Sequence, residues 1–152
     1  MTAHRISAGA LIEADGRLLL VRNVKSGHYD FWVAPGGGVK ADETLEQAVA
    51  REVLEETGLQ VQVGPLRYIE DLVSPTCRTV KFWFGAVVIG GRLDTSHPEA
   101  QQEHIVEAAW LAAGEWAGKT VFPELLQTRY AADRAAGFPS IVRLPLRVMT
   151  VG

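Results

Sequence analysis

The apolar positions in the first third of the chain come in short runs that predict β-strands. Two runs, "RISAGALIEA" at 5–14 and "RLLLVR" at 17–22, are separated by Asp15-Gly16, which is a strong signal for a tight hairpin turn. A third run, "FWVAP", ends at Pro35. The glycines that follow, at 36–38, are interpreted as a tight turn that uses positive φ angles.

The middle of the chain also has the pattern of strands. The run "LQVQVGPLRYIEDLV" at 59–73 predicts strand structure with a break at Gly64-Pro65. The segment 79–91 is rich in aromatic and β-branched residues and predicts a long buried strand. A polar loop at 92–103 leads to one more predicted strand at 104–111.

Residues 45–57 form the clearest helical pattern. Thr44 and Gln47 match a capping box at its start, and Gly58 stands where a helix ends in the left-handed conformation. No proline interrupts the segment. The sequence therefore predicts a helix with defined ends between two predicted strands.

The last third predicts a helix over 122–136, with Pro123 near its first turn and Gly137 at its end. The apolar tail 141–152 is compatible with an edge strand or with a docked extension. Strands and helices thus mix without a regular βαβ alternation. This pattern favours the α/β class, as an α/β sandwich with a mixed sheet, over a doubly wound parallel sheet.

Composition narrows the class of protein. A chain of 152 residues predicts one domain over 1–152, and the net charge of −3 argues against a broad nucleic-acid surface. The single cysteine, Cys77, cannot form an internal disulfide, which suits a reducing compartment. No run approaches the roughly 20 apolar residues of a membrane span. We therefore expect a cytoplasmic protein that contacts neither nucleic acid nor membrane.

Three acidic residues share one side of the predicted helix. Glu52, Glu55 and Glu56 stand at i, i+3 and i+4, and they continue a stripe that begins with apolar residues. Carboxylates at the half-buried end of such a stripe repel one another unless a cation lies between them. A solvated helix face and a site for a divalent cation both account for the pattern, and Mg²⁺ prefers oxygen ligands of this kind.

The surroundings of these glutamates resemble a known motif. Gly37, Glu43 after five residues, and "REVLEETGL" at 51–59 after seven more fill every position of the Nudix box, G-x5-E-x7-R-E-U-x-E-E-x-G-U, in which U is aliphatic. At average residue frequencies such a match arises by chance on the order of 10⁻⁹ per window. A strand ending in Trp-x-x-Pro-Gly-Gly before the box and one ending in Trp-Leu near residue 111 also resemble the family.

The resemblance implies an α/β/α sandwich with a mixed central sheet. It also implies a hydrolase that cleaves a diphosphate linkage in a nucleoside diphosphate derivative, with Mg²⁺ or Mn²⁺ as cofactor. It implies that the metal ligands are Glu52, Glu55 and Glu56, joined by the carbonyl of Gly37. Arg51 and Glu43 would pair to hold the helix carboxylates in place, and Glu52 or Glu55 would accept the proton of the attacking water. An acidic residue before the late strand often completes the site, and Glu103, with Glu99 as the alternative, is the candidate here.

The substrate is less well defined by the sequence. Pro75, sixteen residues after the box, resembles a mark of the ADP-ribose and NDP-sugar subgroup, whereas a nucleoside triphosphate pyrophosphohydrolase and a non-catalytic nucleotide-binding module remain alternatives. The expected partner is a small nucleotide, and a homodimer is left open. Candidate phosphate contacts are Arg5, Arg22, Lys25, Arg78 and Lys81, and candidate stacking residues are Phe31, Trp32, Phe82 and Trp83.

Overall fold

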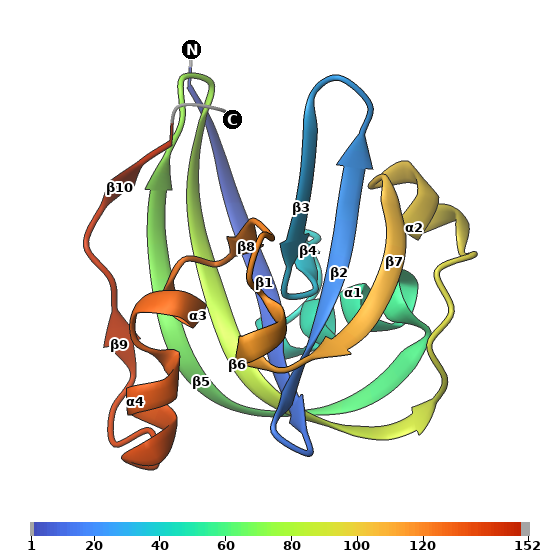
Figure 1. Ribbon diagram of the computed structural model, residues 1–152. Helices are drawn as coiled ribbons and strands as arrows, with labels where there is room; N and C mark the ends of the chain where they lie inside the picture. Colours follow the sequence, from blue (N-terminus) through green and yellow to red (C-terminus); the bar gives the residue numbers. More distant parts are fainter. Residues whose placement is uncertain (1, 150–152) are drawn as a thin grey trace.

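The strands form one strongly bent mixed sheet, with short helices on both of its sides (Figure 1). The computed structural model describes residues 2–149. The strands are β1 (Ala3–Ala14), β2 (Arg17–Lys25), β3 (Tyr29–Val33), β4 (Gly36–Gly38), β5 (Leu59–Val73), β6 (Cys77–Gly91), β7 (Ile105–Leu111), β8 (Val121–Phe122), β9 (Val142–Arg143) and β10 (Arg147–Val148). The helices are α1 (Leu45–Thr57), α2 (Pro98–Gln102), α3 (Leu125–Thr128) and α4 (Tyr130–Ala135), with a 3₁₀ turn, η1, at Ala113–Glu115.

The long strand β1 joins the two halves of the sheet. It runs parallel to β6 over most of its length and turns back antiparallel into β2 through the predicted hairpin. Asp15 and Gly16 have φ angles of 53° and 74°, as a tight hairpin turn requires. The strand order is β10-β5-β6-β1-β2-β3-β8, with β4 beside β1, β7 beside β2 and β9 beside β5. Parallel and antiparallel pairs both occur, so the predicted mixed sheet is confirmed.

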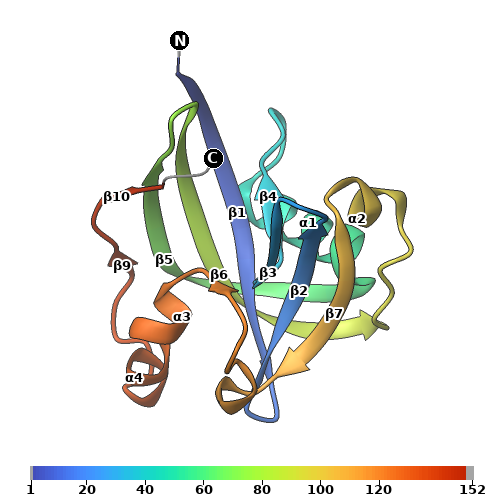
Figure 2. The same ribbon diagram turned by 45° about the horizontal axis from the view of Figure 1, so that its top comes forward.

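Alternation along β1 and β6 separates two apolar layers. Ala8, Ala10 and Ile12 point to the side covered by α1, where they pack with Ala48, Val49 and Val53. Leu11 and Trp83 point to the other side and pack with Leu125, Leu126 and Tyr130. The two views show α1 on one side of the β5–β6–β1 surface and α3 and α4 on the other (Figures 1 and 2). The predicted α/β/α sandwich is therefore confirmed.

Three local predictions were wrong. β5 runs through Gly64-Pro65 as one strand, because irregular register with β6 around these residues accommodates a proline that cannot donate. The expected helix at 122–136 is divided at Arg129, whose φ of −149° is not helical. The expected loop at 92–103 contains the short helix α2.

The glycines at 36–38 were also predicted wrongly, since they form β4 and pair with β1 instead of making a turn with positive φ. The tail follows the outer edge of β5, where β9 and β10 pair with it in parallel over residues 142–148. Residues 150–152 of the predicted tail lie outside the described residues. Within 2–149, no helix is long and apolar enough to cross a membrane.

Candidate active site

Both ends of α1 are fixed by local contacts. The Thr44 hydroxyl accepts from the Gln47 N–H at 3.0 Å, and the Gln47 side chain accepts from the Thr44 N–H at 2.9 Å. At the other end Gly58 has φ +80° and its N–H donates to the Leu54 carbonyl at 2.9 Å. The predicted capping box and left-handed cap are thus present. They set the rotation of α1 and therefore the direction of its glutamates.

Arg51 is the centre of the acidic cluster. Its Nε donates to Glu43 Oε2 at 2.6 Å and its Nη2 to Glu43 Oε1 at 2.9 Å, so the two side chains pair in bidentate fashion. Its Nη1 donates to Glu52 at 3.0 Å and to Glu55 at 3.2 Å, and Nη2 also reaches the carbonyl of Gly38. One guanidinium therefore connects the strand β4, the segment before α1 and two helix carboxylates.

The electrostatic state of Glu43 follows from this contact. The hydrogen bond from the Arg51 guanidinium, together with the backbone N–H of Lys40, lowers the pKa of Glu43 to about 2. In turn, the hydrogen bond to Glu43 raises the pKa of Arg51 above its usual range. The pair is charged over the whole working pH range.

Glu56 has the opposite environment. It is 4% exposed, and burial, followed by the neighbouring Glu52 carboxyl, raises its pKa well above the usual range. The backbone N–H of Gly36 donates to Glu56 Oε1 at 3.2 Å, and this hydrogen bond partly offsets the rise in the pKa of Glu56. A buried carboxyl next to a second carboxyl is unfavourable when both are charged, and a cation between them reverses the sign of the interaction.

The glycines of β4 make room for these side chains. A Cβ at Gly37 would lie 2.6 Å from the carboxyl carbon of Glu52, and a Cβ at Gly36 would lie 2.6 Å from the Cα of Gly9. Gly37 is thus required because a helix carboxylate comes close to its backbone, and Gly36 is required because the neighbouring strand β1 does.

The carboxylates surround a polar cavity of about 270 Å³, lined by Lys40, Arg51, Glu52, Glu55, Glu56, Glu99, Gln102 and Glu103. Both late-loop candidates, Glu99 and Glu103, therefore lie beside the box glutamates. Within residues 2–149, no three His, Cys, Asp or Glu side chains converge as a ready metal-ligand set. Glu55 is instead turned toward Arg51. The donor chemistry fits a hard divalent cation, since the buried pair Glu52 and Glu56 offers only carboxylate oxygens.

The structure separates the candidate phosphate contacts. Arg22 pairs with Asp30 at 2.7 Å, Arg78 pairs with Asp71 at 2.5 Å, and Lys25 is exposed at the end of β2. Arg5 lies beside Gly38, at the edge of the acidic site.

Lys81 lies between the acidic cluster and the interior of the sheet. Its Nζ is 4.4 Å from the centroid of the Trp83 ring. Burial lowers the pKa of Lys81, while the carboxylates of Glu70 and Glu56 oppose that shift. In the strand register it is directly opposite Glu70 on β5 and Ser7 on β1. A cation held there can contact an anion that extends from the acidic cluster toward the sheet.

Beyond Lys81 lies a cavity of about 570 Å³ with a mostly apolar lining. Phe31 and Phe122 meet edge to face there, with ring centroids 5.5 Å apart, and Trp83 lines the same space. Of the other stacking candidates, Trp32 is buried in the core and Phe82 packs on the side covered by α1.

Glu70 and Arg147 are among the residues of this cavity that had not been identified from the sequence. Glu70 is 5% exposed, although glutamate is a residue type that is seldom buried. The available signal was a single glutamate inside the apolar pattern of "YIEDLV", which by itself is equally typical of a strand with one solvated face.

A family model described as the NUDIX domain matches residues 3–128. A MutT-like protein from Streptomyces ambofaciens is 48% identical over 64 residues, which cover 41% of this chain and 40% of that protein. An ADP-ribose pyrophosphatase from Methanocaldococcus jannaschii is 32% identical over 100 residues, which cover 64% of this chain and 59% of that protein. The chain thus spans about half the length of these curated relatives.

Solved structures agree with the architecture. A NUDIX hydrolase from Nitrosomonas europaea is 28% identical with a TM-score of 0.72, covering 88% of this chain and 89% of that chain. A UDP-X diphosphatase has a TM-score of 0.74 at 18% identity, covering 95% of this chain and 68% of that chain. At that identity the second likeness concerns the fold alone.

Proposed function

The chain belongs to the NUDIX domain family, and from this premise we propose that it is a Mg²⁺- or Mn²⁺-dependent hydrolase of a diphosphate linkage in a nucleoside diphosphate derivative. The observation that carries the proposal is the buried carboxyl pair of Glu52 and Glu56 beside the glycine strand β4. Such a pair is costly in a protein that has no cation to bind there.

Glu52, Glu56 and Glu55 are the residues that would hold the metal, with the carbonyl of Gly37 close by. When bound, a divalent cation neutralises phosphate charge and lowers the pKa of a bound water. Binding requires Glu55 to leave its contact with Arg51, which retains Glu43 as its stronger, bidentate partner. Arg51 and Glu43 therefore act as positioning residues for the helix carboxylates.

Residues of this chain can also supply a base for the attacking water, cations for the phosphates and a cavity for the nucleoside. Glu52 or Glu55 is the base that accepts a proton from water, and Glu103 lies close enough to serve as an additional ligand or base. Lys81 and Arg5 are the cations that would contact the phosphates. The aromatic cavity beyond Lys81 has the size and lining to hold a nucleoside.

For the substrate, we favour ADP-ribose or a related NDP-sugar. The relative named ADP-ribose pyrophosphatase supports this choice, as does Pro75 in the turn between β5 and β6. A nucleoside triphosphate is the second candidate, and Arg5 beside Gly38 and Lys81 beside the acidic cluster would then be the contacts for its additional phosphate.

The test is a substrate panel of ADP-ribose, NDP-sugars, dNTPs and dinucleoside polyphosphates, with and without Mg²⁺ or Mn²⁺. The expected result is metal-dependent release of AMP and ribose 5-phosphate from ADP-ribose. Release of pyrophosphate from a dNTP would favour the second candidate. Tight binding of a nucleotide without any product would refute the hydrolase and identify a binding module.

A further inference from the structure

Glu70 is a buried carboxylate that the proposed cleavage does not use. It is 5% exposed, and its Oε1 accepts from the Trp83 indole N–H at 2.7 Å. Within residues 2–149, Trp83 is the one side chain that donates to it. A carboxylate can accept several more hydrogen bonds, and in Glu70 that capacity faces the cavities that this residue lines.

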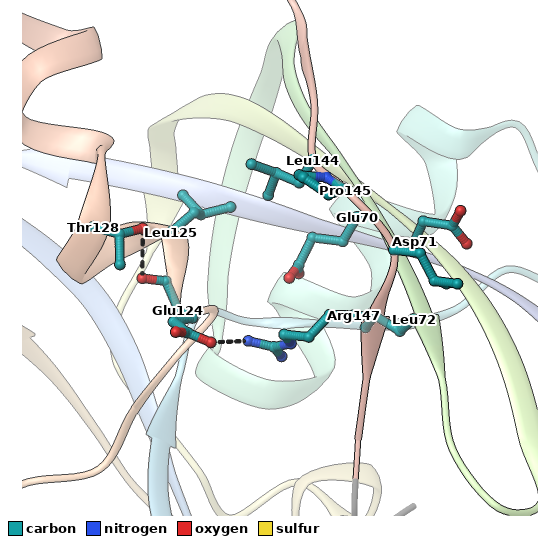
Figure 3. Close-up of a pocket in the computed structure, with 10 residues that line it drawn as sticks. Glu70, Asp71, Leu72, Glu124, Leu125, Thr128, Leu144, Pro145 and Arg147 are labelled. Carbon is teal, nitrogen blue, oxygen red and sulfur yellow. Dashed lines mark hydrogen bonds and ion pairs between the residues drawn. The ribbon is translucent and has the colours of Figure 1, made fainter.

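Glu70 stands where two cavities meet. It lines the cavity of about 570 Å³ that contains Phe31 and Phe122, here called the aromatic cavity. It also lines a second cavity of about 270 Å³, which is bordered by α3 and the C-terminal tail. Leu72 and Arg147 line both cavities as well. Figure 3 shows the Glu70 carboxylate directed into this space, toward Leu125, and the Arg147 guanidinium directed toward Glu124.

The strand register explains this arrangement. Arg147 of β10 is paired with Leu72 of β5, so Glu70, two residues away on the same face, is its diagonal neighbour. Arg147 donates through one nitrogen to Glu124 at 2.5 Å (Figure 3). Its other N–H groups form no hydrogen bond or ion pair with a side chain of the residues that the structure describes. An acceptor and a donor thus face the same cavity from adjacent positions.

The order of groups along the sheet matches the order of parts in a nucleotide. The acidic cluster lies at one end, Lys81 follows, and Glu70 is directly opposite Lys81 on the neighbouring strand. A phosphate held at Lys81 therefore places the nucleoside in the aromatic cavity, where Phe31 offers a partly exposed ring for stacking. The edge of the base then meets Glu70 and Arg147.

We propose that Glu70 and Arg147 select a base that carries an exocyclic amino group next to a ring acceptor, with adenine preferred over hypoxanthine. This proposal rests on the proposed function, since it assigns the base of the same nucleotide. Glu70 accepts from the amino group and Arg147 donates to the adjacent ring nitrogen. A carbonyl in place of the amino group would put two acceptors face to face in a buried site, which leaves the carboxylate unsatisfied.

Arg147 lies outside residues 3–128, the part of the chain that matches the NUDIX family model. Half of the selecting pair therefore comes from the tail. This gives the tail a role in specificity that is separate from the family's own motif.

The experiment is a calorimetric titration with ADP and with IDP, first in EDTA and then with Mg²⁺. IDP has an oxo group where ADP has its amino group. The wild-type protein should bind ADP about 10- to 100-fold more tightly than IDP, which is the usual worth of a hydrogen bond to a charged group. Glu70→Gln should reduce this ratio to below about 3-fold, because the amide can still accept from Trp83 while offering an N–H to a carbonyl.

Asp71→Asn is the matched control. It removes the same charge one residue away, but the Asp71 carboxylate pairs with Arg78, and Asp71 is not among the residues that line the aromatic cavity. The ADP-to-IDP ratio should stay as in the wild type. Arg147→Ala tests the pair independently if Glu70→Gln does not fold, and it should also lower the ratio by about 10-fold.

Equal affinity of the wild type for ADP and IDP would overturn the inference, as would a preference that survives in folded Glu70→Gln. These results differ from a failure of the proposed function. Adenine preference without any hydrolysis leaves the inference standing and removes the hydrolase, whereas metal-dependent hydrolysis without base preference does the reverse.

Discussion

Glu43 and Glu56 show how neighbouring carboxyls in one cluster differ through their contacts alone. Glu43 receives a bidentate hydrogen bond from Arg51, so its pKa falls to about 2. Glu56 is buried next to Glu52, so its pKa rises. The first residue is suited to hold structure, and the second is suited to bind a cation.

Glu56→Gln should lower kcat by about 100-fold or more, because the buried site loses the carboxylate that a divalent cation requires. The melting temperature in metal-free buffer should remain nearly unchanged. The Gln side chain can still accept from the Gly36 N–H, and it removes the repulsion with Glu52. Metal-dependent hydrolysis of ADP-ribose, followed by the release of AMP, measures the effect, with Glu46→Gln on the exposed side of α1 as control. Full activity of Glu56→Gln would refute the site.

Glu43 predicts a pH dependence of stability. Because its pKa is lower in the folded protein than in the unfolded chain, its stabilising contribution is complete above the unfolded value near 4.5. It is lost as the pH falls from there toward about 2. Glu43→Gln should therefore flatten the fall in stability between these values. Urea unfolding of both proteins from pH 6 to pH 3 measures this, and parallel curves would contradict the assignment.

At this scale the sequence identified the acidic cluster and named Lys81 among several candidate cations, but it did not identify Glu70 or Arg147. Glu52, Glu56 and Arg51 are neighbours along one helix, so their spacing alone brings them together. Glu70, Lys81 and Arg147 come from three strands, and they meet through strand register that no local pattern specifies.

At the scale of elements, α1 and β4 form one unit in which the strand is shaped to fit the helix. The capping residues of α1 are local signals, and both ends of the helix were predicted correctly. β4 was predicted as a turn, because a glycine triplet has no local signal for strand pairing. Its need for glycine arises from β1 on one side and from the helix carboxylates on the other.

Substitutions in β4 should separate stability from activity. Gly36→Ala puts a methyl group against the backbone of β1, which cannot move aside, and should cost about 1–3 kcal/mol of folding free energy. Gly37→Ala puts it against the flexible end of Glu52, which can move, and should leave the free energy of unfolding within about 1 kcal/mol.

The displaced Glu52 carboxylate in Gly37→Ala should nevertheless lower kcat by about 10- to 100-fold. Urea unfolding and steady-state rates of both variants provide the comparison. If Gly37→Ala unfolds at a lower urea concentration than the wild type but keeps the wild-type kcat per folded molecule, the close contact at Glu52 is structural and not functional.

At the scale of the whole molecule, the bend of the sheet at β1 brings the functional parts together. α1 covers one side of the sheet, and Lys81, Trp83 and Glu70 lie on the other side. The glycines of β4 have no side chains, so the carboxylates of α1 can approach this strand closely. The mixed sandwich could be predicted because the order of strand and helix patterns restricts the possible sheets. The position of the tail could not, since short strands with two residues each carry almost no pattern.

Metal binding should therefore be detectable as stability of the entire fold. A ligand that binds only the folded chain stabilises it by about 2.7 kcal/mol at a concentration 100 times its Kd. For a domain of this size that corresponds to a rise in Tm of roughly 5–10 °C. Differential scanning calorimetry with Mg²⁺, Mn²⁺ or EDTA measures the shift, and Glu56→Gln should lose most of it while melting like the wild type in EDTA. An equal metal-induced shift in both proteins would place the bound cation away from the helix carboxylates, because only a site that includes Glu56 makes the shift depend on that residue.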